Sequence, residues 1–229
     1  MRASIIVFPG SNCDRDAQVA IESVTGGTPT MVWHRDSNLP DTDLIVLPGG
    51  FAHGDYLRCG AIAAHSPIMK DVVRRAEAGT PVLAICNGFQ VAIEAGLLPG
   101  ALVRNANLKF ICKPVHLRVE NTHTPFTHMY DEDEVILLPI ANHDGNYMAD
   151  ADTLAELTDQ GRIVLRYCDS AGAVTEAANP NGSAMNIAGI ANAERTILGM
   201  MPHPERFVDE ALGGDYGRSV FGSLMGALA

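Results

Sequence analysis

The sequence predicts an α/β fold: an open, mostly parallel β-sheet with helices on both faces and an antiparallel extension in the second half. Two observations carry this prediction. In the first half, short β-branched runs alternate with helix-compatible segments, an alternation that calls for right-handed crossovers and parallel strands. In the second half, extended segments follow one another with turn residues between them, which is typical of antiparallel pairing. The 229 residues, 47% of them hydrophobic, can bury one large core, so we expect a single domain over residues 1–229.

The first half should contain buried strands that stop at turn residues, at 3–8, 28–33, 43–47 and 81–85. Two helix-compatible segments lie between them, residues 14–24 and residues 57–78, and Pro67 should break the second. Asn12 or Asp14 is placed to cap the first helix. In sheets of this kind, ligand chemistry gathers at the carboxyl ends of the strands.

The second half should contain extended segments at 101–119, 134–140 and 171–191, the last folded into two strands around the turn at 179–182. A buried strand at 196–200 and a closing helix at 216–228 then complete the chain. No internal repeat, low-complexity tract or linker interrupts this pattern.

Charge and cysteine usage exclude several classes of function. The formal net charge is −11, from 27 acidic residues against 16 Lys plus Arg, and this balance argues against nucleic acid as a ligand. The five cysteines form no C-x-x-C pair, so we expect reduced thiols and no metal site. The apolar run near the N-terminus is too short for a signal peptide, and no stretch is long enough to span a membrane. We therefore expect a cytoplasmic protein.

The segment Ala-Ile-Cys-Asn-Gly-Phe-Gln at 84–90 predicts a nucleophile elbow, in which an apolar strand turns sharply into a helix at Cys86. The turn would expose the sulfur, and the following helix N-terminus would stabilise a thiolate. Gly88 would permit a close backbone approach, and the amide of Asn87 could face a developing oxyanion. The other four cysteines are interpreted as small apolar side chains.

A thiolate nucleophile needs a general base and a way to protonate a departing amine, and His203-Pro204-Glu205 offers both. The imidazole would face the sulfur while the carboxylate orients the imidazole. The intervening proline fixes its own backbone and biases His203 towards an extended conformation, which gives the pair a stiff mount just after a strand.

The segment Pro-Gly-Gly-Phe at 48–51 follows the third predicted strand. Gly50 or Phe51 could supply the second backbone amide of an oxyanion hole, because the two glycines allow an amide to turn towards the substrate.

These motifs together resemble the class I, triad-type, glutamine amidotransferases, and within them the glutaminase subunits of phosphoribosylformylglycinamidine synthases of purine biosynthesis. The resemblance covers nearly the whole chain and rests on the segments at 8–14, 48–58, 85–90 and 201–206. It implies a flavodoxin-like core in which Cys86, with His203 and Glu205, forms a glutamyl thioester and releases ammonia. It also implies that Gly50 and Phe51, and Asn87 with Gln90, hold the glutamine and its oxyanion.

The resemblance further implies two partners, a synthetase subunit that uses ATP and magnesium to make formylglycinamidine ribonucleotide, and a small bridging subunit. The sequence agrees with this division of labour. None of its three lysines lies in a G-x-x-x-x-G-K-[ST] phosphate loop, and no G-x-G-x-x-G occurs, so we expect no cofactor in this subunit. The loop at 141–147 resembles a family loop that faces the active site, although a polar turn is an equally good interpretation.

Two alternatives remain open from the residues themselves. One is another cysteine hydrolase of the same fold; Asn87 argues against it, because many such enzymes place their histidine directly after the cysteine. The other is a non-enzymatic flavodoxin-like module in which Cys86 is a sensor thiol. A sensor thiol has no need of His203, so a requirement for His203 distinguishes an enzyme from a sensor.

Overall fold

The computed structural model describes residues 1–228. Its strands are β1 (Ala3–Val7), β2 (Thr30–Trp33), β3 (Leu44–Leu47), β4 (Val82–Ile85), β5 (Ala101–Val103), β6 (Ile111–Val119), β7 (Val135–Asn142), β8 (Asn146–Met148), β9 (Ile163–Cys168), β10 (Ile187–Ala191) and β11 (Ile197–Met200). Its α-helices are α1 (Asp14–Thr25), α2 (Ala61–Ala64), α3 (Met69–Glu77), α4 (Asn87–Glu94), α5 (Ala151–Asp159) and α6 (Arg218–Ala227).

One nine-stranded sheet runs through the molecule in the order β2-β1-β3-β4-β11-β10-β9-β6-β7. The pairs from β2 to β11 are all parallel, and those from β11 to β7 are all antiparallel. A separate two-stranded sheet joins β5 to β8. The predicted fold class is therefore confirmed, and β11 is the strand at which the parallel half meets the antiparallel half.

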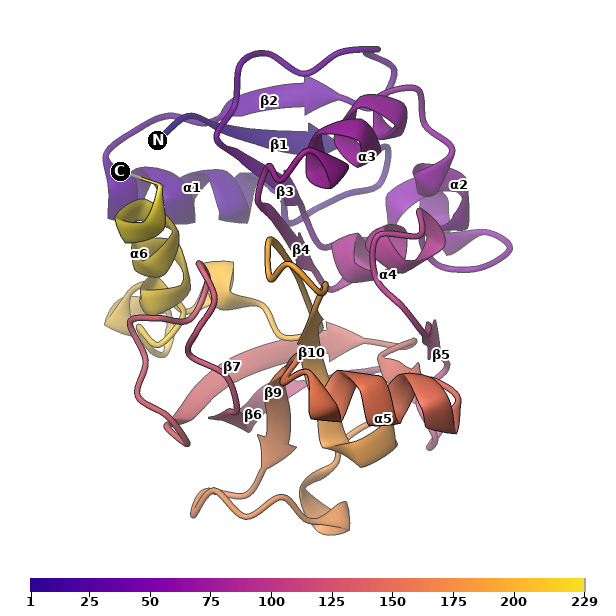
Figure 1. Cartoon of the computed structure of the whole chain (residues 1–229), viewed down its shortest axis with the longest axis vertical. Coiled ribbons are helices and arrows are strands. Elements are labelled where there is room, and N and C mark those ends of the chain that lie inside the picture. The colour runs from indigo at the N-terminus through magenta and orange to yellow at the C-terminus, as the bar shows by residue number, and fades with distance from the viewer. Residues whose placement is uncertain (229) are drawn as a thin grey trace.

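Helices cover both faces of the parallel half (Figure 1). The closing helix α6 packs on α1 on one side of the strands, while α2, α3 and α4 lie on the other side. Helix α4 contacts β3, β4 and β11. The helix α5 lies beside the antiparallel strands, in the lower half of the view. Within residues 1–228, no helix has the length and hydrophobicity needed to cross a membrane.

Three sequence predictions need correction. Residues 171–191 form only one strand, β10, because the first part of that segment is held by turns and side-chain hydrogen bonds, including Asn186 Nδ2 to the Thr175 carbonyl at 2.7 Å. The strand predicted over 101–119 is split by a loop into β5 and β6. Neither Asn12 nor Asp14 caps α1, whose N-cap is Cys13 with no side-chain hydrogen bond.

Three elements have no counterpart among the sequence predictions: the short strand β8, strand β9 and helix α5. Strand β9 is an apolar run after Gly161, and helix α5 begins at a standard N-cap in which the Asp150 carboxylate accepts a hydrogen bond from the Thr153 amide at 2.8 Å. The local patterns for both are present in the sequence, since a β-branched and aromatic run follows a glycine and an Asp precedes a helical segment.

Helix α4 lies unusually close to the sheet, and two glycines make this approach possible. A Cβ at Gly88 would lie 1.9 Å from the Leu47 carbonyl oxygen of β3. A Cβ at Gly199 of β11 would lie 2.1 Å from the Phe89 ring of α4. The close backbone approach predicted for Gly88 is confirmed, and it fixes where the chain must turn between β4 and α4.

We expect Gly88→Ala to destabilise the protein by about 1–3 kcal/mol or more, because the added methyl collides with backbone and α4 must move away from the sheet. Gly27→Ala is the matched control, since a Cβ there meets nothing closer than 3.6 Å. Urea unfolding of both variants measures the difference. Equal midpoints for the two variants would contradict the packing described here.

Candidate active site

Cys86 lies at the sharp turn between β4 and α4, where the sequence predicted an elbow. Its backbone has φ 51° and ψ −106°, a conformation that a non-glycine residue adopts only under constraint from its surroundings. The Cys86 amide donates to the Met200 carbonyl at the end of β11, at 2.7 Å. The prediction that the turn exposes the sulfur is wrong, because Cys86 is only 4% exposed, and its sulfur lies 3.8 Å from the Ala141 carbonyl oxygen. Strain is thus stored at the residue predicted to be the nucleophile.

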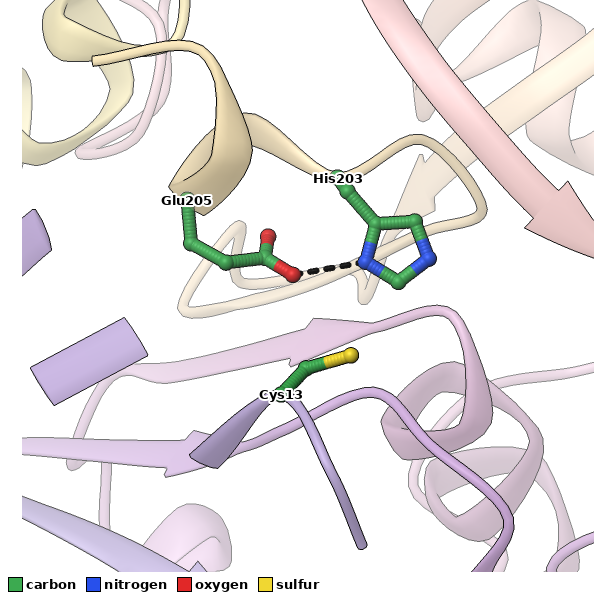
Figure 2. A group of neighbouring side chains, drawn as sticks. All are labelled: Cys13, His203 and Glu205. Atoms are coloured by element: carbon green, nitrogen blue, oxygen red, sulfur yellow. Dashed lines mark hydrogen bonds and ion pairs between the residues drawn. The ribbon is translucent and has the colours of Figure 1, made fainter. Parts of the chain in front are cut away.

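His203 and Glu205 form a buried hydrogen-bonded pair just after β11 (Figure 2). Nδ1 of His203 lies 2.6 Å from Oε1 of Glu205, and the residues are 1% and 2% exposed. The short helix η4 (Pro204–Arg206) follows His203 directly and carries Glu205. The His203 amide donates to the Pro139 carbonyl of β7 at 2.8 Å, so the antiparallel half of the sheet also holds the imidazole.

The His203 imidazole lies close enough to both Glu205 and Cys86 for each to affect its pKa. Burial lowers the pKa of His203, but the Glu205 carboxylate and the Cys86 and Cys13 sulfurs act in the opposite direction and hold the pKa well above its ordinary value. The Nε2 atom of His203 is buried and has no hydrogen-bond partner among the described residues. This arrangement suits an imidazole that is charged beside the Cys86 sulfur and available to move a proton.

Gly50 and Phe51, the two residues predicted to supply the second oxyanion-hole amide, differ in whether their amide is free in the loop after β3. Phe51 is not available, because its amide donates to the Gly10 carbonyl at 3.2 Å. Gly50 has φ +133°, and a Cβ at this position would lie 2.6 Å from the Asn12 backbone nitrogen, so only glycine fits. Asn87 is the first residue of α4, and the first amides of a helix have no partner within the helix. Gly50 and Asn87 are therefore the better pair of donors.

The side chains of Asn87 and Gln90 hold the loops around the site. Oδ1 of Asn87 accepts from the Ala52 amide at 3.0 Å, and its Nδ2 donates to Asp55 at 3.0 Å and to Gln90 at 2.8 Å. Nε2 of Gln90 donates to the Asp144 carbonyl at 2.7 Å. These hydrogen bonds connect the first turn of α4 to the loop at 52–55 and to the loop at Asp144, both of which line the site.

Cys13 lies beside the His203–Glu205 pair, although we interpreted it from the sequence as a small apolar side chain. Its sulfur accepts a hydrogen bond from Nη2 of Arg206 at 3.0 Å, and ligand atoms of Cys13, His203 and Glu205 lie within 4.8 Å of one another. Figure 2 shows the three side chains together. Such a set could in principle bind a soft metal ion, but the Arg206 guanidinium against the sulfur opposes a cation. We interpret Cys13 and Arg206 as groups that support the His203 turn.

The Arg206 side chain also donates to Asp16 of α1, at 3.3 Å. Helix α1 packs on η4, so this contact fixes the turn that carries His203 and Glu205. The sequence offered one sign of this pairing, since a charged Arg directly follows Glu205 and acids begin the first helix. The pairing itself depends on residues almost two hundred positions apart, so sequence spacing could not have predicted it.

Two cavities adjoin these residues. The larger has a volume of about 580 Å³, and its lining includes Asp55, Arg58, Cys59, Arg104, His143 and Asp144. The smaller, of about 240 Å³, is lined by Cys13, Gly50, Phe110, Cys112, Ala141 and His203 together with Asn12, Arg206 and Phe51. Phe51 lines both cavities. The loop at 141–147 reaches both as well, which agrees with its predicted position at the active-site side.

Comparison with known proteins agrees with this geometry. Residues 1–216 match the model of the CobB/CobQ-like glutamine amidotransferase domain. The chain is 55% identical to a phosphoribosylformylglycinamidine synthase subunit PurQ from Zymomonas mobilis over 230 residues, with 100% of both chains covered. It is 57% identical, also with 100% of both chains covered, to a subunit of the same name from Rhodospirillum rubrum.

Among solved structures, that of PurLQS from Thermotoga maritima matches with a TM-score of 0.88 and 45% identity, over 100% of this chain and 99% of the other. The glutaminase domain of CTPS from Trypanosoma brucei, with bound acivicin, matches over 100% of this chain and 95% of the other. Its TM-score of 0.58 and 12% identity show a shared fold alone. The elbow, the buried His203–Glu205 pair and these matches lead to one conclusion: the chain belongs to the CobB/CobQ-like family of glutamine amidotransferases.

Proposed function

We propose that this chain is the glutaminase subunit of a phosphoribosylformylglycinamidine synthase, with residues 1–229 acting as one glutaminase domain. It hydrolyses the side-chain amide of L-glutamine and supplies ammonia for the synthesis of formylglycinamidine ribonucleotide. The observation that carries the catalytic part is the strained Cys86 elbow beside the buried His203–Glu205 pair. Full-length identity of 55–57% to subunits of that name supports the pathway.

In the first half of the reaction, the Cys86 thiolate attacks the amide carbon of glutamine. The amides of Gly50 and Asn87 stabilise the oxyanion that forms, and one such donor is typically worth roughly 2.7–4 kcal/mol of transition-state stabilisation. His203 then gives its proton to the departing nitrogen, the C–N bond breaks, and ammonia leaves behind a glutamyl thioester. Glu205 orients the imidazole and stabilises its charged form.

In the second half, His203 takes a proton from a water molecule, which attacks the thioester carbon. The C–S bond breaks, glutamate is released, and the Cys86 thiolate is restored. The chemistry needs neither a metal nor a cofactor on this chain, because the proton transfers are complete within the triad.

The larger cavity is the place we propose for the amino-acid end of glutamine. Asp55 and Asp144 can pair with the α-ammonium group, and Arg104 can pair with the α-carboxylate. Burial raises the pKa of Asp55, while hydrogen bonds from Cys59 and Asn87 act against this rise. Binding here would place the side-chain amide towards α4, where Asn87 and Gln90 tie the cavity walls to the elbow.

ATP and magnesium act on a partner synthetase in this proposal, and a small bridging subunit joins the assembly. Two neighbouring side chains next to the larger cavity favour a docked partner: Tyr56 is 74% exposed and Leu57 is 95% exposed. Exposed apolar groups of this kind gain free energy when a partner removes them from water. The same loop has positive φ at His53, Asp55 and Leu57, which is a strained backbone conformation for non-glycine residues. A partner that binds this loop could relieve the strain and so change the loop's conformation.

The first test is amidine synthesis by the complex rebuilt from this chain, the synthetase and the bridging subunit. We expect Cys86→Ala to abolish synthesis from glutamine and to leave synthesis from ammonium chloride unchanged, because only ammonia production depends on the thiol. Cys168→Ala, which alters a buried cysteine of β9, should be active with both nitrogen sources. Continued use of glutamine by Cys86→Ala would refute the mechanism, and would leave the sensor interpretation of Cys86 open.

Replacing the carboxylate of the triad should change the pH dependence of glutaminase activity. The raised pKa of His203 keeps the imidazole charged up to a high pH, and expulsion of the amine needs that proton. Glu205→Gln removes the main group that raises this pKa, so the basic limb of the kcat/KM profile should move to lower pH. We expect kcat to fall about 100-fold or more. The exposed Glu210→Gln is the control, and a profile of Glu205→Gln identical to that of the control would contradict this role.

The isolated chain should hydrolyse glutamine slowly and be stimulated when the synthetase and bridging subunits bind. A subunit that turned over freely without an acceptor would waste glutamine, and the constrained 51–57 loop gives a partner a means of control. Steady-state glutamate formation, with and without the partners, measures the stimulation. Full turnover by the chain alone would show that the site needs no partner.

A further inference from the structure

Two imidazoles meet at the loop that follows β3 and carries Gly50. The rings of His34 and His53 lie with their centroids 5.0 Å apart and their planes at 74°, so the edge of one ring faces the other. His34 follows β2 directly, and His53 lies in the short helix η1 (Ala52–Asp55), soon after Gly50. Neither histidine belongs to the triad or lines the two cavities next to it. The pair therefore takes no direct part in the chemistry.

His34 is held in place by two neighbouring segments. Its amide donates to the Val7 carbonyl of β1 at 3.0 Å, and its carbonyl accepts from the Ile68 amide at 3.3 Å. Its ring Nδ1 lies 3.2 Å from the Ser66 hydroxyl oxygen, and the residue is 5% exposed. The His34 imidazole is thus a fixed, buried surface against which His53 packs.

The second ring nitrogen of each histidine is the unusual feature of this pair. Nε2 of His34 and Nε2 of His53 are both buried, and neither has a hydrogen-bond partner among the described residues. A neutral imidazole carries one N–H group and one lone pair, whereas a charged imidazole carries two N–H groups that both need acceptors. Ser66 can satisfy one nitrogen of His34, but residues 1–228 offer no acceptor for the other. The packing therefore suits two uncharged rings.

No carboxylate of the described residues compensates a charge on either ring. Among residues 1–228, histidine forms ion pairs only at His143 and His203. Asp55, the acid in the same loop as His53, accepts instead from Nδ2 of Asn87 at 3.0 Å. A proton taken up by the pair would therefore bury a charge without a counter-ion, which is strongly unfavourable.

The other groups packed on His34 are uncharged or positive. Phe8, directly after β1, and Trp33 of β2 place aromatic rings near it, at centroid distances of 6.3 Å and 4.6 Å. Arg35 follows it in the chain. Burial lowers the pKa of His34 from its ordinary value of 6.5, and the positive charges of His53 and Arg35 lower it further. The ring thus resists protonation while the loop is in this position.

The position of His53 is coupled to that of Gly50 through the backbone. His53 has φ 55° and ψ 24°, a left-handed conformation that a non-glycine residue keeps only when its surroundings favour it. Its amide donates to the Pro9 carbonyl at 2.6 Å, and the Phe51 amide donates to the Gly10 carbonyl at 3.2 Å. Movement of the His53 ring would break this pairing of the two segments and displace Gly50 with it.

Given the proposed glutaminase function, on which this inference rests, we propose that the uncharged His34–His53 pair positions the oxyanion loop, and that proton uptake by the pair displaces the Gly50 amide and slows glutamine hydrolysis in acid. Both histidines are positioning residues, since they act through Gly50. With the loop in place the pair binds fewer protons than with the loop displaced. The active arrangement is therefore fully favoured above the ordinary His34 pKa of 6.5 and is lost as the pH falls through the lowered pKa.

Glutamate formation by the assembled complex, measured as a function of pH, tests this role. His53→Phe keeps a ring against His34 but cannot take up a proton. We expect the ratio of kcat at about pH 7.5 to kcat at about pH 5.5 to be at least about threefold smaller in His53→Phe than in wild type. KM for glutamine should stay unchanged, because an oxyanion donor acts in the transition state. His65→Phe is the matched control, since His65 is an exposed histidine next to Ser66, and it should keep the wild-type ratio.

His34→Gln is a second variant, because its amide can bond to the Ser66 hydroxyl and stays uncharged at every pH. It should lower the ratio in the same way, and it decides the question if His53→Phe fails to fold. A merely structural role for either ring would lower kcat equally at both pH values. Wild-type ratios in the two variants, or an equal fall in His65→Phe, would overturn the proposal.

Nuclear magnetic resonance of the full chain, with carbon-13-labelled histidine, gives a readout that does not depend on activity. The His34 ring should titrate with a midpoint below 6.5 in wild type, and this midpoint should rise in His53→Phe, because the neighbouring charge is removed. A wild-type midpoint at or above 6.5 would overturn the proposal. Failure of the wild-type complex to form glutamate at any pH would refute the glutaminase function itself, an outcome distinct from failure of the histidine pair.

Discussion

The close packing of α4 on the sheet is the constraint on which the site depends. Gly88 lies against the Leu47 carbonyl of β3, and Phe89 lies against Gly199 of β11, so the helix axis is fixed within van der Waals contact of two strands. The chain leaving β4 therefore has a single residue in which to turn, and Cys86 adopts a strained backbone to do so. Packing energy spread over the helix holds this local strain, and the thiol is presented at the carboxyl end of the parallel strands.

The other half of the triad comes from the junction between the parallel and antiparallel halves of the sheet. Strand β11 pairs with β4 on one side and with β10 on the other, and His203 follows it after a two-residue step. The His203 amide bonds to Pro139 of β7, so the antiparallel extension acts as a support for the imidazole. On the opposite side, Arg206 ties the same turn to Cys13 and Asp16 at the start of α1. Three parts of the chain thus determine one side chain's position.

Elements with a strong local pattern were predicted well. The parallel strands, the elbow and the break at Pro67 each depend on residues close together in the sequence, and the structure contains them all. The errors arise where distant contacts decide. Residues 171–183 have strand-like composition but are held as turns by buried asparagines, and the Phe51 amide, a candidate for the oxyanion, is bound to Gly10. Strand β9 and helix α5 show that some local patterns were present and were not used.

The sequence by itself predicted the type of chemistry, because a cysteine at a strand-to-helix turn and, separately, a histidine two residues before a glutamate are recognised by residue type and short spacing. Tertiary structure decided everything that depends on which distant groups meet. It placed Cys13 beside His203 and left the amide of Gly50, rather than that of Phe51, free for an oxyanion. It also engaged the side chains of Asn87 and Gln90 in hydrogen bonds between loops, and it formed two cavities next to the site. The physical reason is that hydrogen bonds and cavities belong to pairs of surfaces, and only folding brings those surfaces together.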